Sequence, residues 1–261
     1  MSQARIELKF KDNTPDYDFF KYMANEVHAP KINYSQKLLY RVFHDTKLKT
    51  GGRFYGGWWQ SISSKLRNKI LIDGMRTVEV DFTGFYANIL YAINGSGYSG
   101  DPYGGIADEK YRGVIKRAFF AMVCASKPLS KPPNTLVIRQ TGMTWKEISD
   151  AILSKHKQIS HYFYSDYGRQ LMRYDSDLAE DVMLTFLSKF MKPILPIHDS
   201  FRVHQHFDEQ LMYIMFVSFE RIFNQTIQIE PEYYFFNEPP DNTDDFLKKQ
   251  QLEDEDALFF F

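Results

Sequence analysis

The sequence lacks the features that mark secreted, disulfide-built and membrane-spanning proteins. It has one cysteine in 261 residues, which excludes a disulfide framework and a zinc site built from several cysteines. No run of about 18 apolar residues occurs, so no membrane partner is expected. The first residues, MSQARIELKFKDN, lack the apolar stretch of a secretory signal. Together these absences predict a reducing, cytoplasmic location.

Aromatic residues and an uneven charge distribution are what the sequence has in excess. With 23 Phe and 17 Tyr, aromatics reach 16%, which predicts bulky cores or stacking surfaces. The net charge is only −1, but residues 237–261 hold eight acidic side chains and two lysines, so they carry −6 and the rest carries +5. A mildly basic body with an acidic tail is compatible with a nucleic-acid partner.

Hydrophobic patterns along the chain predict an α+β fold, because hairpins occur in place of regular βαβ repeats. Helices are expected at 16–23, 34–44, 85–92, 111–125, 144–157, 168–190 and 208–223. Strands are expected at 77–82, in a hairpin over 194–204, and at 228–235. The chain divides into an N-terminal helical segment (1–49), a core (50–236) and a flexible acidic tail (237–261).

Two aspartates lie within apolar segments, where a charged carboxylate is energetically unfavourable. Asp81 ends the apolar strand TVEVDF, and Asp199 lies in the turn of the hairpin ILPIHDSFRVH. Carboxylates in hydrophobic surroundings are unfavourable unless they are paired or bind a metal. Two of them on adjacent strands could hold two Mg²⁺ ions about 4 Å apart, as in phosphoryl displacement. Each could equally be an ordinary turn or cap residue.

Between these aspartates, the predicted helix at 111–125 carries two cations and an aromatic ring on one face. Arg112, Lys116 and Phe120 are spaced four residues apart, so they project from the same side. The cations could bind phosphates, and the ring could pack against a base or sugar. The alternative is an amphipathic helix with solvated basic residues and Phe120 in the core.

The order of these pieces resembles that of family A polymerases, the group of bacterial DNA polymerase I and the single-subunit phage RNA polymerases. The stretch TGGRFYGGWWQSI is similar to their TGR motif and the QNI-type segment that follows. VEVDFTGFYANIL resembles motif A, the helix at 111–125 resembles motif B, and PIHDSF resembles motif C. The resemblance covers residues 50–205 and implies a right-hand palm with a short fingers helix. The segment before residue 50 is short, so a reduced or absent thumb and no exonuclease domain are expected, which departs from the usual family pattern.

The resemblance also implies a magnesium-dependent nucleotidyltransferase, most simply a DNA-directed DNA polymerase that acts in replication or repair. Asp81, the Phe82 carbonyl and Asp199 would bind two Mg²⁺ ions, for which Mn²⁺ could substitute. The residues that match the triphosphate-binding positions of motif B are Arg112, Lys116 and Phe120. Lys116 would also neutralise or protonate the leaving pyrophosphate.

Further matching residues concern the DNA and the sugar. Arg53 and Gln60 would contact the primer–template DNA, and His198 would lie near the primer end. Tyr86, five residues after Asp81, occupies the place where DNA-making members carry a bulky residue that collides with a ribose 2′-hydroxyl. Deoxynucleoside triphosphates are therefore the expected substrates.

Some residues depart from the DNA polymerase I pattern and leave alternatives open. Ser200 replaces a Glu, as in RNA-making members, and Cys124 with Ala125 stands where a Tyr–Gly pair is usual. A primase or single-subunit RNA polymerase is the alternative within enzymes. A catalytically inactive nucleic-acid-binding palm is a second alternative, and an unrelated metal-dependent phosphohydrolase, with the two aspartates far apart, is a third.

The acidic tail ends in three phenylalanines, Phe259 to Phe261. Exposed terminal aromatics favour contact with another surface over simple solvation. Similar tails on single-stranded-DNA-binding proteins dock on partner proteins, so a protein partner is one expectation. The other is that the phenylalanines pack on the body of the same chain.

Overall fold

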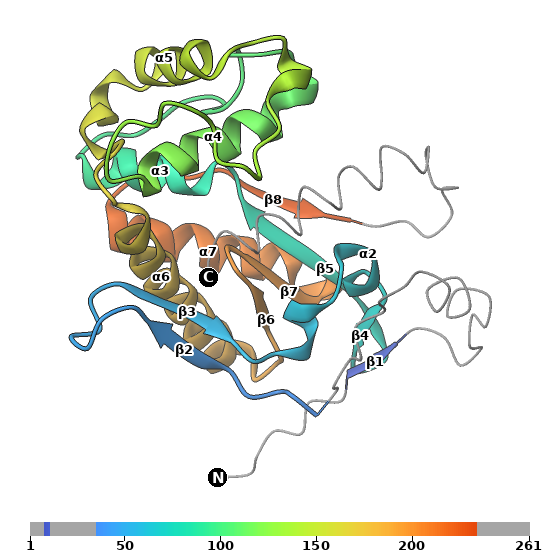
Figure 1. The fold of residues 1–261 in the computed structure, drawn as a ribbon. Coiled ribbons are helices and arrows are strands. Elements are labelled where there is room, and N and C mark those ends of the chain that lie inside the picture. Colours follow the sequence, from blue (N-terminus) through green and yellow to red (C-terminus); the bar gives the residue numbers. More distant parts are fainter. Residues whose placement is uncertain (1–7, 11–34, 234–261) are drawn as a thin grey trace.

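The computed structural model describes residues 8–10 and 35–233, an α+β arrangement of one antiparallel sheet with helices packed on it (Figure 1). Every strand pair in the sheet is antiparallel. The strands are β1 (Leu8–Phe10), β4 (Ile70–Ile72), β5 (Met75–Phe82), β6 (Leu195–Ile197), β7 (Ser200–His204) and β8 (Ile229–Glu232).

Strand β5 is the centre of the sheet, and it has the alternating pattern expected from the sequence. One edge pairs with β7 along its length, while the other edge pairs with β4 at its start and β8 at its end. Val78, Val80 and Phe82 point into the main core. Because side chains alternate along a strand, Glu79 and Asp81 lie on the opposite face. The strand is thus apolar on one face and charged on the other.

Five helices longer than two turns supply the rest of the main core, and all five were predicted from sequence periodicity. Figure 1 shows α3, α4 and α5 grouped beyond the end of β5, with α6 and α7 packed along the sheet. Their bounds are α3 (Phe85–Ile93), α4 (Arg112–Cys124), α5 (Trp145–Lys155), α6 (Gly168–Phe190) and α7 (Asp208–Phe223). Shorter turns are η1 (Trp58–Ser61), α2 (Ser64–Arg67), η2 (Glu109–Tyr111), η3 (Arg139–Thr141), η4 (Lys157–Tyr162) and η5 (Gln205–Phe207).

A separate two-stranded hairpin, β2 (Tyr40–Phe43) with β3 (Gly51–Tyr55), packs against α6 (Figure 1). The helix predicted for 34–44 is therefore wrong. The residues of β2 alternate between exposed (Tyr40, Val42) and half-buried (Arg41, Phe43) positions, a pattern that suits a strand. Gly51, with a φ of 76°, accommodates a bulge in the pairing that a residue with a Cβ would strain.

The remaining parts of the sequence-based division fall partly outside the described residues. The helix predicted at 16–23 and the tail at 237–261 lie there. The adjacent tryptophans Trp58 and Trp59 are both buried in a second, smaller core with β4 and β6, so they serve packing. Among the described residues, no helix is long and apolar enough to cross a membrane.

Candidate functional site

Strand pairing brings Asp81 and Asp199 together. Asp81, near the end of β5, is directly opposite Ser200, the first residue of β7. Asp199 precedes Ser200 in the two-residue turn between β6 and β7. His198, the first residue of that turn, has a φ of 54°, the left-handed conformation that tight hairpin turns require. The third alternative, an unrelated phosphohydrolase, predicted that the two aspartates lie far apart, and the strand pairing contradicts that expectation.

The environment of Asp81 disfavours a charged carboxylate. Burial raises its pKa well above the usual value, and the nearby charge of Asp199 adds to this, while Lys116 acts in the opposite direction. Its Oδ1 atom is buried and has no hydrogen-bond partner among the described residues. A buried carboxylate oxygen without a partner is costly, and a cation is the kind of ligand that would compensate it.

Helix α4 presents the three predicted nucleotide-binding residues on one half-exposed face. Arg112, Lys116 and Phe120 are intermediate in exposure, whereas Ile115 and Phe119 are buried. Lys116 is close enough to Asp81 to lower its pKa. The basic face of α4 therefore lies toward the paired aspartates.

Arg112 is already paired within the chain. Its Nε and Nη2 donate to the two carboxylate oxygens of Asp101 at 2.7 and 2.8 Å, and the charge of Arg112 helps to lower the Asp101 pKa against the opposing effect of burial. This bidentate pair is one-third exposed. A triphosphate that reaches Arg112 would thus share it with Asp101 or displace that carboxylate.

Tyr86, the residue predicted to select the sugar, is buried in the first turn of α3. Its ring centroid lies 4.8 Å from that of Phe120 and 5.5 Å from that of Phe85. The Arg53 guanidinium lies over the same ring, 5.8 Å from its centroid. The Tyr86 hydroxyl is buried with no hydrogen-bond partner among the described residues. The ring is therefore positioned by its neighbours and not by its own hydroxyl.

Arg53, predicted to contact primer–template DNA, is 4% exposed. Its Nε donates to Oδ2 of Asp175 on α6 at 2.7 Å, and Asp175 is 2% exposed. Burial raises the pKa of Asp175 to about 6, although Arg53 lowers it. A direct contact with DNA would need an exposed surface that the Arg53 side chain does not have in this structure.

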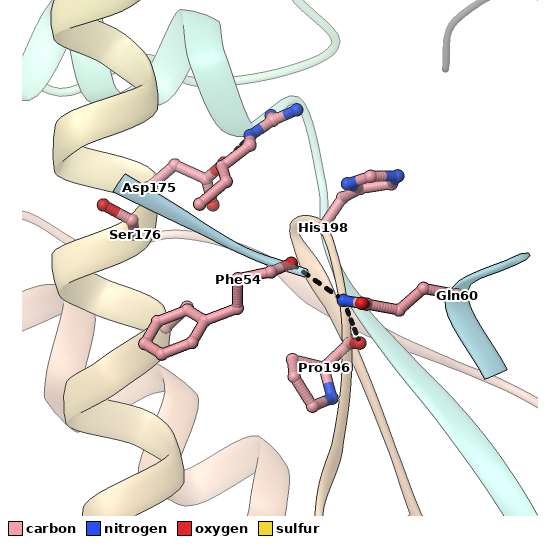
Figure 2. Close-up of a pocket in the computed structure, with 8 residues that line it drawn as sticks. Phe54, Gln60, Asp175, Ser176, Pro196 and His198 are labelled. Carbon is pink, nitrogen blue, oxygen red and sulfur yellow. Dashed lines mark hydrogen bonds and ion pairs between the residues drawn. The ribbon is translucent and has the colours of Figure 1, made fainter. Parts of the chain in front are cut away.

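Gln60, the other predicted DNA contact, holds elements together. Its Nε2 donates to the carbonyls of Phe54 at 2.9 Å and Pro196 at 3.1 Å, and Figure 2 shows the amide between these two carbonyls. Its Oε1 accepts from the Gly57 amide at 3.2 Å. The side chain thus joins β3 to β6, directly beside the turn that carries Asp199.

His198 lines a small polar pocket with Arg53, Asp175 and Gln60 (Figure 2). Burial lowers its pKa to about 4, and the Arg53 charge contributes to the same effect. Its buried Nδ1 has no hydrogen-bond partner among the described residues. The imidazole is therefore neutral at physiological pH and has a ring nitrogen that can bind a further group.

A second charged cluster lies beside the aspartates on the same two strands. Glu79 Oε2 accepts from Arg202 Nη2, and Glu79 Oε1 accepts from Ser200 Oγ, both at 2.7 Å. Arg67 approaches Glu79 to 3.5 Å. Burial alone would raise the Glu79 pKa, but Arg67 and Arg202 hold it below its usual value. Ser200, which favoured an RNA-making enzyme in the sequence, here belongs to this cluster.

The oxygen donors at the aspartate pair suit a hard divalent cation such as Mg²⁺. Asp81 and Asp199 supply two carboxylates, the Phe82 carbonyl follows in the chain, and the unpartnered Asp81 Oδ1 is the observation that fits a bound ion. Within residues 8–10 and 35–233, no group of three or more His, Cys, Asp or Glu side chains is arranged to hold a metal. Any ion here would therefore complete its coordination with water or substrate oxygens.

The structure also reveals residues near this site that are not among the predicted site residues. Asp101 and Tyr103 lie beside α4, Asp175 lies beside Arg53, and Glu79 lies beside Asp81. Burial raises the pKa of Tyr103 to about 12, opposed by Lys116 and Arg112. Glu79 had a visible sequence signal, because it alternates with Asp81 on one strand, and Asp175 begins an acidic stretch, DSDLAED.

Comparison with known proteins adds no relative. A scan against protein-family models finds no matching family, and a search of curated proteins finds no significant match.

Proposed function

We propose that this protein is a template-directed nucleotidyltransferase, and specifically a DNA-directed DNA polymerase with a palm-like catalytic sheet. The observation that carries the proposal is the meeting of Asp81 and Asp199 at the end of paired strands, with a buried Asp81 oxygen left without a partner. The half-exposed face of α4, with Lys116 near Asp81, supports a site for a triphosphate.

In this proposal the chain's own residues bind and orient the reactants. Mg²⁺ bound by the two aspartates and the Phe82 carbonyl would activate the primer 3′-hydroxyl and stabilise charge on the triphosphate. Lys116 contacts the triphosphate oxygens. As the primer oxygen bonds to the α-phosphorus, the 3′-hydroxyl proton passes to water. The bond from the α-phosphorus to the leaving oxygen breaks, and Lys116 donates a proton to the pyrophosphate.

Substrate selection depends on Tyr86 and Phe120, whose rings pack together. In this proposal Phe120 contacts the base or sugar of the incoming nucleotide. The rigid Tyr86 ring occupies the volume that a ribose 2′-hydroxyl would need. Deoxynucleoside triphosphates are therefore the proposed substrates, and primer–template DNA is the proposed partner.

The experiment is extension of a labelled primer–template in Mg²⁺ with deoxynucleotides or ribonucleotides. Wild-type protein is expected to extend with deoxynucleotides, and Asp199→Asn is expected to lose about 10³-fold in rate because one carboxylate ligand is gone. Asp73→Asn is the matched control, since Asp73 is an exposed turn residue paired with Lys192.

Each outcome separates the alternatives. Extension with ribonucleotides, or products without a primer, would indicate an RNA polymerase or primase. DNA binding without incorporation, unaffected by Asp199→Asn, would indicate an inactive binding module. Release of phosphate without extension would indicate a phosphohydrolase.

A further inference from the structure

The ion pair between Arg53 and Asp175 is buried, although arginine and aspartate side chains are mostly exposed in proteins. The two residues come from β3 and α6, 122 positions apart, and each is less than 5% exposed. A buried ion pair is a poor source of net stability, because desolvation of both charges offsets their attraction. Its presence beside the candidate site therefore calls for a role other than stabilisation.

Arg53 connects this ion pair to the Tyr86 ring. The guanidinium lies 5.8 Å from the Tyr86 ring centroid, within the range of a cation–π contact. Asp175 binds the Nε of the same guanidinium, and since a guanidinium is planar and rigid, the bond fixes its orientation over the ring. The bond from Arg53 to Asp175 on α6 thus orients the guanidinium that lies over the Tyr86 ring on α3.

The Tyr86 ring belongs to the main core and is 8% exposed. Its hydroxyl, buried and unpartnered among the described residues, contributes no hydrogen bond. Phe85 and Phe120 contact the ring by aromatic packing, which permits sliding more readily than a hydrogen bond does. Arg53 is a charged neighbour of this ring, and Asp175 binds the Nε of Arg53.

We infer that Asp175 is a positioning residue for sugar selection, acting through Arg53 on the Tyr86 ring. The inference rests on the proposed function, because the choice between deoxyribose and ribose has meaning only for a polymerase. A shift of the ring of about 1 Å would open room for a 2′-hydroxyl, since discrimination by shape depends on close fit. In this account Arg53 acts by positioning the Tyr86 ring and does not contact DNA.

The test compares kcat/KM for deoxynucleotide and ribonucleotide incorporation in wild type and Asp175→Asn. Asparagine keeps the shape of the side chain but removes the charge that holds the guanidinium. We expect the preference for deoxynucleotides to fall about tenfold, mainly through tighter KM for ribonucleotides. Arg53→Lys serves as a second variant if Asp175→Asn does not fold, because lysine keeps a cation for Asp175 but lacks the planar group over Tyr86.

Two controls distinguish positioning from a general structural role. Asp177→Asn is the matched control, because Asp177 also lies on α6 and binds an arginine of the hairpin, Arg41, at 2.9 Å. It should leave the preference unchanged. The second control repeats Asp175→Asn in a Tyr86→Ala background, where the ring is absent and no further loss of preference is expected.

The outcomes are distinct. A loss of preference that depends on the Tyr86 ring supports the inference. An unchanged preference, or an equal change with and without the ring, overturns it while leaving the proposed function intact. Wild-type protein that incorporates neither nucleotide overturns the proposed function and this inference with it.

Discussion

Two charged clusters occupy neighbouring positions on the same pair of strands, and they differ in how completely the carboxylate oxygens of Glu79 and Asp81 are bonded. At Glu79 both carboxylate oxygens accept hydrogen bonds, from Ser200 and Arg202, and Arg67 adds a further positive charge. Two residues further along β5, Asp81 faces the like charge of Asp199, and its Oδ1 accepts no hydrogen bond among the described residues.

The difference shows how one strand can serve both folding and chemistry. A carboxylate with both oxygens bonded and with positive charges beside it is consistent with the fold on its own and needs no ligand. An incompletely bonded pair of carboxylates is held in place only because the surrounding strands determine its position. Such local conflict is common at functional sites. Of the following three predictions, the first and the last test whether the two clusters divide in this way, and the second concerns a buried histidine outside both clusters.

The largest expected effect on stability comes from the bonded cluster. Glu79→Gln should lower the free energy of unfolding by about 3 to 5 kcal/mol, because it leaves the fully buried Arg202 without its counter-charge. Urea unfolding measures the change. Glu220→Gln, at an exposed position on α7, is the control and should stay within about 0.5 kcal/mol. An equally small effect of Glu79→Gln would show that this cluster is not structural.

The second prediction concerns how the free energy of unfolding depends on pH, through one buried neutral histidine. His156 is fully buried between the Tyr91 hydroxyl, 3.0 Å from Nδ1, and the Pro102 carbonyl, 2.9 Å from Nε2. Burial lowers its pKa from 6.5 to about 4. The unfolded chain therefore binds a proton between pH 6.5 and 4 that the folded chain does not. Its contribution is complete above pH 6.5 and falls by about 3 kcal/mol towards pH 4.

The measurement for His156 is urea unfolding as a function of pH for wild type and His156→Gln. Glutamine can retain one donor and one acceptor but does not titrate. The wild type should lose more stability than the variant across this range, and parallel curves would contradict the assignment. The difference between the two curves removes the contributions of the carboxylates.

The smallest expected effect on stability, with the opposite sign, belongs to the incompletely bonded pair. Asp81→Asn removes one of two like charges, so it should raise the free energy of unfolding by about 1 kcal/mol. Mg²⁺ should stabilise the wild type by about 1.4 kcal/mol at ten times its dissociation constant and should not stabilise the variant. Thermal unfolding with and without Mg²⁺ tests both, and a destabilised variant would place Asp81 with the structural cluster.

Sequence periodicity was sufficient for the main helices and for the strands around Asp81 and Asp199, because amphipathic repeats of 3.6 and 2 residues specify which face is buried. It failed at β2, because the conformation of this short segment is determined by pairing with β3 and not by its own hydrophobic pattern. The hairpin of β6 and β7 could also be predicted from the sequence, because two short apolar runs flank the polar residues of the turn at Asp199.

Long-range polar pairing could not be predicted in the same way. The bond between Arg53 and Asp175 joins residues 122 positions apart, and a helical Asp in a polar stretch normally indicates a solvated surface. The bonds from Gln60 to Phe54 and Pro196 depend on how β3 and β6 are placed. Roles for such residues need the tertiary structure, whereas the metal, nucleotide and DNA assignments remain predictions for experiment.

The backbone at His198 restricts which amino acids this position can tolerate. A φ of 54° is readily adopted by glycine and, at modest cost, by asparagine, aspartate or histidine. Valine, isoleucine and threonine are excluded because their branched Cβ would clash with the backbone there. Any relative that keeps this two-residue turn is therefore expected to lack a β-branched residue beside Asp199, whatever reaction it performs.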